Sequence, residues 1–177
     1  IRTIIIPTPG NKFIDADFSS IEARVLAWLA GESWSLEVFR THGKIYEAQA
    51  SQMFGVPLEK IRKGNPEYAL RQKGKVAVLA LGYQGSVGAL INMGALDMGI
   101  PEEDLPGIVR MWRRTNKRCV ALWRAVENAA KTTTQTGRQT AAGKLLFSRE
   151  IDRYNDFLTI LVPSGRKLHY VRPKVEN

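Results

Sequence analysis

The sequence contains very little cysteine and histidine: Cys119 is the single cysteine of 177 residues, and the two histidines are His42 and His169. One cysteine excludes an intrachain disulfide and a cysteine-based zinc site, which is typical of a reducing cytoplasm. The sequence also lacks the roughly eighteen consecutive apolar residues that a membrane-spanning helix needs. Its start, Ile1–Pro7, lacks the basic-then-apolar order of a signal peptide. We therefore expect a cytoplasmic protein without a membrane partner.

The sequence also has fewer acidic than basic residues. The chain has 26 lysines and arginines against 17 acidic residues, which gives a net charge of +9 at pH 7. Residues 1–40 carry four basic and five acidic side chains, whereas residues 60–75 carry six basic side chains and one acidic one. Such an excess indicates an anionic partner, with nucleic acid as the first candidate, although a solvated outer face would have the same composition.

The hydrophobic pattern predicts a helix-rich α+β protein. Four helices are expected. The first begins at Ser19 or Ser20 and ends at Gly31, the second and third cover about 44–54 and about 67–82, and the fourth is one long amphipathic helix over 102–131. The expected strands are 11–17, 143–147, and a hairpin of 158–162 with 167–171. The order is thus a strand, a helical insertion of roughly a hundred residues, and a return to β structure.

Asp17 and Glu22 lie five residues apart, where the first expected strand gives way to a helix. A carboxylate at the end of a strand commonly binds Mg²⁺, which keeps several waters and takes one or two carboxylates plus substrate phosphates. A structural role fits equally well. Ser19 and Glu22 match a capping box, and Asp17 suits the positive end of a helix dipole. Spacing alone leaves both interpretations open.

A basic segment, Arg71–Lys75, follows about fifty residues later and runs on to Tyr83. On a helix, Arg71, Lys75, Leu79 and Tyr83 fall along one stripe. Two cations one turn apart can bind successive phosphates, the arginine through a planar fork and the lysine as a point charge. An aromatic ring two turns beyond Lys75 can stack on a base or sugar. A solvated basic face with a core tyrosine would give the same pattern.

Together with its neighbours, the acidic pair resembles a motif of one enzyme family. The segment Phe13–Arg24, FIDADFSSIEAR, is similar to motif A of the family A DNA polymerases: Asp, an aromatic, Ser, any residue, Ile-Glu, any residue, Arg. The resemblance implies that Asp17 binds both catalytic metal ions and that the backbone carbonyl of Phe18 is a further ligand. It also implies that Glu22 lies against the sugar of the incoming nucleotide and excludes a 2′-hydroxyl. Ser20 replaces the glutamine common in the family.

The spacing of Arg71, Lys75 and Tyr83 is similar to motif B, which the family carries on its mobile fingers helix. This resemblance implies that Arg71 and Lys75 bind the triphosphate of a deoxynucleotide, and that Lys75 can protonate the pyrophosphate leaving group. Tyr83 would pack near the templating base. Leu79 stands where many members have phenylalanine. Tyr46 occupies a position often filled by a phosphate-contacting histidine, and its hydroxyl can still donate a hydrogen bond.

The resemblance implies a template-directed DNA polymerase of phage or prophage type, acting in the cytoplasm of a bacterial host. Such an enzyme adds deoxynucleotides to a primer 3′-hydroxyl with two Mg²⁺ ions. Residues 1–30 would be the first palm piece, 31–135 the fingers with the motif B helix at about 67–83, and 136–177 a β segment returning to the palm. The implied partners are primer–template DNA, deoxynucleoside triphosphates, and missing palm and thumb segments of the same polymerase.

One motif of the family is not found: the His-Asp pair that supplies the second catalytic carboxylate. Gly43 follows His42, and Tyr170 follows His169. Together with a start at Ile1, this predicts a catalytically incomplete fragment, without the remaining palm, thumb and exonuclease, that does not polymerise DNA alone.

Two other interpretations stay open. A relative of the single-subunit RNA polymerases would share the Asp and the Lys-to-Tyr spacing, although Glu22 argues against room for a 2′-hydroxyl. A non-catalytic nucleic-acid-binding module is the second. It is permitted by the basic side chains of 102–131, which are Arg110, Arg113, Arg114, Lys117 and Arg118.

Overall fold

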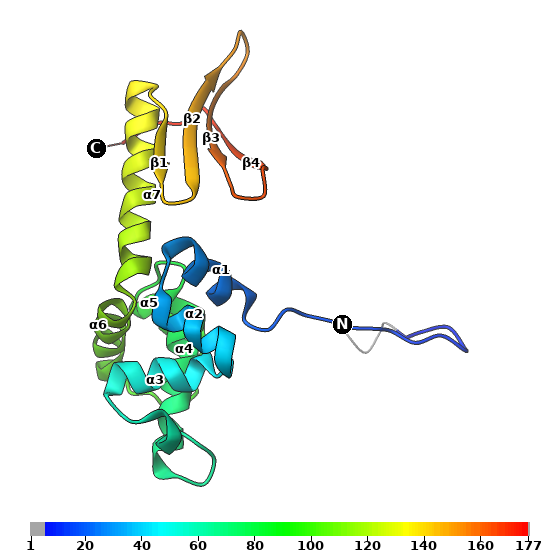
Figure 1. Ribbon diagram of the computed structural model, residues 1–177, viewed down its shortest axis with the longest axis vertical. Coiled ribbons are helices and arrows are strands. Elements are labelled where there is room, and N and C mark those ends of the chain that lie inside the picture. The colour runs from blue at the N-terminus through cyan, green and yellow to red at the C-terminus, as the bar shows by residue number, and fades with distance from the viewer. Residues whose placement is uncertain (1–5, 177) are drawn as a thin grey trace.

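The computed structural model describes residues 6–176, which form a helical body and a small antiparallel sheet (Figure 1). The α-helices are α1 (Ile21–Ala30), α2 (Ser33–Thr41), α3 (Ile45–Phe54), α4 (Leu70–Leu81), α5 (Val87–Asn92), α6 (Leu105–Thr115) and α7 (Lys117–Thr136). The strands are β1 (Thr140–Ala142), β2 (Leu145–Ile151), β3 (Asp156–Leu161) and β4 (Lys167–Val171). The helix-rich α+β character expected from the sequence is confirmed.

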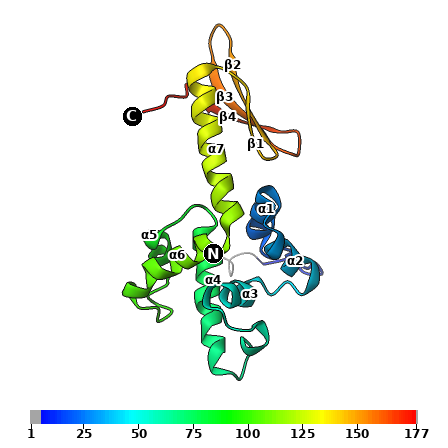
Figure 2. The same ribbon diagram turned by 60° about the vertical axis from the view of Figure 1, so that its left-hand side comes forward.

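The helical body is built around α4, which contacts α3, α5 and α6. Figure 2 shows α1 and α2 on one side of the body and α5 and α6 on the other. Leu81, Leu90, Leu105 and Ile108 are almost completely buried in its core. Burying such side chains contributes roughly 1.5–3 kcal/mol each, so this core holds α4 in place.

The sheet packs against the second half of α7 in the order β1-β2-β3-β4, with every pair antiparallel. Phe147 is fully buried between the sheet and the helix, beside Ala129. Arg149 ties the two layers together, because it donates to both carboxylate oxygens of Asp156 and to the carbonyl of Thr134 at the end of α7. The hairpin expected from the sequence is confirmed as β3 and β4.

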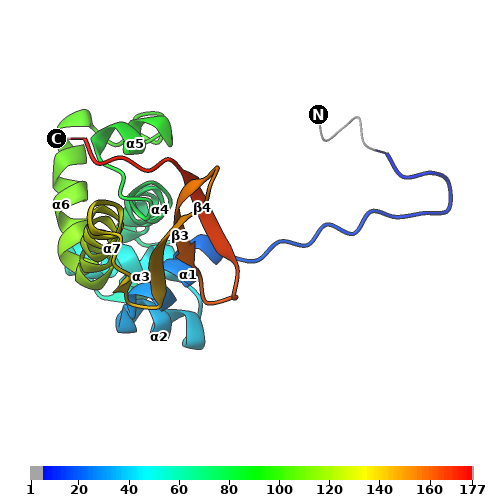
Figure 3. The ribbon, with the colours of Figure 1, turned by 90° about the horizontal axis from the view of Figure 1, so that it is seen from above.

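The strand expected at 11–17 is not formed. Residues 6–18 lie away from the helical body, with a turn at residues 9–10 and no strand (Figures 1 and 3). Phe13, Ile14 and Phe18 are 61%, 93% and 78% exposed. A strand needs a neighbour to take its backbone hydrogen bonds, and none of the described strands pairs with this segment. Asp17 therefore lies on exposed extended chain rather than at a strand end.

The capping box expected at Ser19 and Glu22 is also absent. The residue that precedes α1 is Ser20, which has a left-handed backbone (φ 51°) and makes no side-chain capping hydrogen bond. The helix ends as expected at Gly31, whose positive φ of 68° suits a residue without a Cβ.

The single helix expected over 102–131 is two helices, α6 and α7, with a break at Asn116. The Asn116 side-chain amide is buried and donates to the Trp112 carbonyl at 2.9 Å and to Gln49 Oε1 at 3.1 Å. The backbone of Asn116 (φ −104°, ψ 55°) lies outside the helical range, and the Arg118 N–H in the first turn of α7 donates to Glu32 Oε2 at 2.9 Å, so a carboxylate caps the start of the second helix. The sequence pattern also did not predict α2, α5 or β1.

The helices expected at about 44–54 and 67–82 are confirmed as α3 and α4, although 3₁₀ structure at Pro66–Ala69 replaces the first turn of the latter. Among residues 6–176, no helix combines the length and the apolar character that crossing a membrane requires.

Candidate functional site

The position of α4 follows from its close packing on α3. Gly74 has no side chain, and a Cβ there would clash with the Tyr46 carbonyl oxygen and lie 3.0 Å from the Ala50 Cβ. Val76 and Ala77, which follow it on α4, are also buried. The stripe with Arg71, Lys75 and Leu79 is left partly exposed. Glycine between the two cations thus allows a close helix contact while the cations stay accessible.

The three cations at the start of α4 have different surroundings. Arg71 Nε donates to Glu47 Oε1 on α3 at 2.8 Å, and Lys73 Nζ donates to Asp104 Oδ2 at 2.7 Å. Within residues 6–176, no ion pair of Lys75 is found. Lys75 is therefore the cation of this helix that does not have to leave a carboxylate in order to bind an anion.

Glu22 lies in the first turn of α1 and is exposed. Arg24, two residues later, is held locally: its Nε donates to the Ser19 carbonyl at 2.9 Å, and its guanidinium lies 4.3 Å from the centre of the Phe39 ring. The acidic motif therefore presents one carboxylate to solvent at the start of a helix, while its arginine packs against α2.

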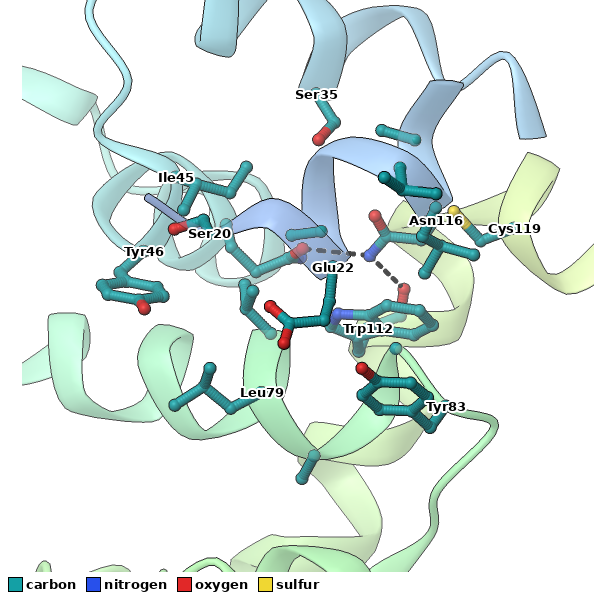
Figure 4. A pocket seen from close by; sticks show the side chains of 18 of the residues that line it. Ser20, Glu22, Ser35, Ile45, Tyr46, Leu79, Tyr83, Trp112, Asn116 and Cys119 are labelled. Atoms are coloured by element: carbon teal, nitrogen blue, oxygen red, sulfur yellow. Dashed lines mark hydrogen bonds between the residues drawn. The ribbon is translucent and has the colours of Figure 1, made fainter. Parts of the chain in front are cut away.

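A cavity of about 800 Å³ separates the start of α1 from the end of α4 (Figure 4). Glu22 lines it from the α1 side, and Leu79 and Tyr83 line it from the α4 side, with Tyr46 of α3 at another wall. Tyr83 is 74% exposed, so its ring is free to contact a ligand. Residues of the acidic motif and of the basic motif, together with Tyr46, thus line the same cavity.

The inner wall of this cavity is formed by side chains from α3, α6 and α7. Trp112 stacks on Trp123 with ring centres 5.4 Å apart, and the Asn116 amide bonds Gln49 behind it. Burial raises the pKa of the Cys119 thiol to about 12, with a smaller contribution from the Glu32 carboxylate. The thiol is therefore neutral and suits a packing role, not a nucleophilic one.

The structure does not bring all the expected site residues together. Asp17, Phe18, Arg71 and Lys75 are not among the residues that line the cavity. The described part of the chain also contains no cluster of three or more histidine, cysteine or acidic side chains that could hold a metal ion. The carboxylate that lines the cavity is that of Glu22, and Asp17 is exposed on the segment that precedes α1.

Some residues that support the cavity wall and Arg71 could not be predicted from the sequence. Glu47, Gln49 and Asn116 act through contacts with residues 24 or 67 positions away, and no local pattern marks such contacts. Trp112 and Cys119 did give a signal, because both belong to the apolar stripe expected over 102–131. That stripe predicts a core position but not a cavity wall.

Comparisons with known proteins match the chain to one group of enzymes. The model of a protein family described as DNA polymerase family A matches residues 1–156. A DNA polymerase of Bacillus phage SP02 is 54% identical over 176 residues, which are 99% of this chain and 26% of that polymerase. DNA polymerase I of Rhizobium leguminosarum is 49% identical over 59 residues, which are 33% of this chain and 6% of that protein.

The thermostable DNA polymerase I of Thermus aquaticus is 28% identical over 167 residues, which are 94% of this chain and 18% of that enzyme. The chain therefore spans about a quarter of the phage polymerase and less of the bacterial ones. Residues 157–177, which include most of β3 and all of β4, lie beyond the family match but within the match to the phage protein.

Proposed function

The chain belongs to DNA polymerase family A, and from this membership we propose that it forms the nucleotide-binding part of a template-directed DNA polymerase. The observation that carries the proposal is the cavity that Glu22 shares with Leu79 and Tyr83. These residues belong to the two motifs that resemble motifs A and B, and the cations of the second motif lie on the same helix as Leu79. A deoxynucleotide needs both an anion-binding helix and a place for its sugar and base.

In this proposal, Arg71 and Lys75 bind the triphosphate. Charged hydrogen bonds from a guanidinium and an ammonium to phosphate are stronger than neutral ones, and the one-turn spacing places the cations on successive phosphates. Lys75 also donates the proton that the pyrophosphate leaving group takes up. An ammonium without a carboxylate partner in the described chain suits both tasks.

We place the sugar and the base of the nucleotide in the cavity. Glu22 contacts the sugar, and its carboxylate leaves no room for a 2′-hydroxyl. Tyr83 and Leu79 pack near the base, where an exposed ring provides a stacking surface. The Tyr46 hydroxyl donates a hydrogen bond to a phosphate. The selection of deoxynucleotides over ribonucleotides therefore depends on α1, whereas the affinity for phosphate depends on α4.

Mg²⁺ is the cofactor that these residues suit. The carboxylate of Asp17 and the carbonyl of Phe18 are hard oxygen ligands on an exposed segment, and such donors, completed by substrate phosphates, are those that Mg²⁺ prefers. Two bound ions would steady the attacking and leaving oxygens. In this proposal Asp17 and the Phe18 carbonyl would bind the metal ions, and Lys75 would contact the pyrophosphate leaving group.

We assign residues 1–30 to the palm, 31–135 to the fingers and 136–177 to a β segment that returns to the palm. The partners are primer–template DNA, deoxynucleoside triphosphates and the other segments of the same polymerase. The second catalytic carboxylate would come from one of those segments, since neither histidine of this sequence precedes an aspartate. The likeness to a Bacillus phage polymerase supports a phage or prophage origin and action in the cytoplasm of a bacterial host.

Titration with a deoxynucleoside triphosphate and Mg²⁺ tests the proposed site. Wild-type protein should bind, R71A and K75A should each weaken binding by roughly tenfold, and Q72A on the same helix should not. Binding that neither R71A nor K75A weakens would contradict the assignment of the basic motif. DNA binding without any nucleotide binding would favour the nucleic-acid-binding module instead, and equal affinity for ribonucleotides would favour the RNA polymerase interpretation.

Primer extension tests the proposed incompleteness. Residues 1–177 alone should extend no primer in the presence of Mg²⁺, because two metal ions need a second carboxylate. Template-dependent extension by the purified polypeptide would refute this part of the proposal.

A further inference from the structure

Arg71 is held from three sides before any nucleotide binds. Its Nε donates to Glu47 Oε1 at 2.8 Å, and its guanidinium carbon lies 5.3 Å from the centre of the Tyr46 ring and 5.9 Å from that of the Tyr68 ring. The Arg71 and Glu47 side chains are only 28% and 15% exposed. The contact is therefore partly shielded from water, which makes it stronger than a surface ion pair.

The way Arg71 is held leaves its outer edge available. A guanidinium carries five N–H donors in a planar fork, and Glu47 takes the one on Nε. Within residues 6–176, neither terminal nitrogen of Arg71 makes a hydrogen bond or an ion pair. An oxyanion can therefore bind the two terminal nitrogens while Glu47 keeps its bond to Nε.

We infer that Glu47 is a positioning residue for the triphosphate, an inference that rests on the proposed function. It fixes the direction of the Arg71 fork, so that a phosphate meets a guanidinium already in place. An unheld arginine loses rotamer freedom when it binds a ligand, and this loss weakens binding. The Glu47 carboxylate also repels the phosphate, so its two effects oppose each other, and orientation outweighs repulsion.

Two substitutions of Glu47 separate these effects. E47Q keeps an acceptor for Nε and removes the charge, whereas E47A removes both. The dissociation constant for a magnesium deoxynucleoside triphosphate should rise by about threefold to tenfold in E47A and stay at or below the wild-type value in E47Q. In an R71A background, E47A should have no further effect, because Glu47 acts only through Arg71.

Asp104 provides the matched control, since its carboxylate holds Lys73, another cation of α4, at 2.7 Å. D104A should leave nucleotide affinity unchanged, although it also removes an ion pair of this helix. Equal losses of affinity in D104A and E47A would show that Glu47 merely supports the packing of α4 and would overturn the inference.

A measurement without nucleotide completes the test. The Arg71 Nε–H resonance, identified by its loss in R71K, should exchange slowly with water in wild type and E47Q and rapidly in E47A. Rapid exchange in wild type, or unchanged nucleotide affinity in E47A, would overturn the role of Glu47. A wild-type chain that binds no nucleotide but protects this proton would contradict the proposed function and leave the contact itself supported.

Discussion

Arg71 and Lys75 lie one helical turn apart but are constrained differently. Glu47 and two tyrosine rings hold the guanidinium of Arg71, whereas no ion pair of Lys75 is found in the described residues. A held, planar group defines where a phosphate binds, and a flexible ammonium can follow a phosphate that moves or leaves. The surroundings of the two side chains therefore suit the different tasks proposed for them.

Cys119 gives a prediction at the scale of one residue. Its side chain is 3% exposed, and burial raises its thiol pKa to about 12. Since only the thiolate reacts, labelling of the folded chain by a disulfide reagent at pH 8 should be at least about a hundredfold slower than labelling in denaturant. The absorbance of the coloured thiolate that a chromogenic disulfide reagent releases measures the labelling rate. Complete labelling of the native protein at the denatured rate would contradict the buried position.

Gly74 gives a prediction at the scale of two helices. A Cβ at this position would clash with the Tyr46 carbonyl oxygen on α3. G74A should therefore force α4 away from α3 and lower the free energy of unfolding by about 1–3 kcal/mol. Urea unfolding followed by circular dichroism measures the change.

Gly88 is the matched control for this prediction, because it lies in α5 and a Cβ there would meet no atom within 4 Å. G88A should be neutral or raise stability by up to about 1 kcal/mol, since alanine is the better helix former. The same loss of stability in both variants would show that the close contact between α3 and α4 is not what requires Gly74.

The sheet gives a prediction about pH. Hydrogen bonds from Arg149 hold the pKa of Asp156 below its ordinary value of 3.8. A carboxyl whose pKa is lower in the folded chain stabilises the fold above the unfolded pKa, and this contribution is lost as the pH falls through the folded pKa. The melting temperature of the wild type should thus fall on acidification below about pH 4.

D156N should have a lower melting temperature at pH 7 and a smaller further fall below pH 4, because its side chain cannot titrate. D97N, which changes an exposed carboxylate outside the sheet, should follow the wild-type profile. Identical acid profiles of D156N and wild type would rule out the ion pair as a source of the pH dependence.

At the element scale, local signals made α3, α4 and the β3–β4 hairpin predictable. Gly55, for example, ends α3 in the left-handed conformation that glycine favours. Features that depend on distant partners were not predictable. The strand expected at 11–17 has the right alternation but no neighbouring strand among those described, and the start of α7 is capped by Glu32, 86 residues before Arg118.

For the whole molecule, the fold shows which motif residues share a cavity and which neighbouring residues support them, and the two sequence motifs do not contain this information. The resemblance named Glu22, Leu79 and Tyr83, and the structure places all three on one cavity between α1 and α4. Their roles stay predictions, as do those of Asp17, Arg71 and Lys75, which do not line that cavity. The contact between Glu47 and Arg71 arises only when α3 packs on α4, and the inner wall arises only when α3 packs with α6 and α7. Neither packing could be read from the two motifs.

If α4 binds the phosphate chain of a deoxynucleotide, as we propose, the protein should distinguish a deoxynucleoside triphosphate from its monophosphate, and this affinity difference should depend on the two cations of α4. With Mg²⁺ present, wild-type protein should bind the triphosphate at least about tenfold more tightly than the monophosphate. The R71A/K75A double variant should bring this ratio close to one. A ratio that stays at the wild-type value in the double variant would contradict the claim.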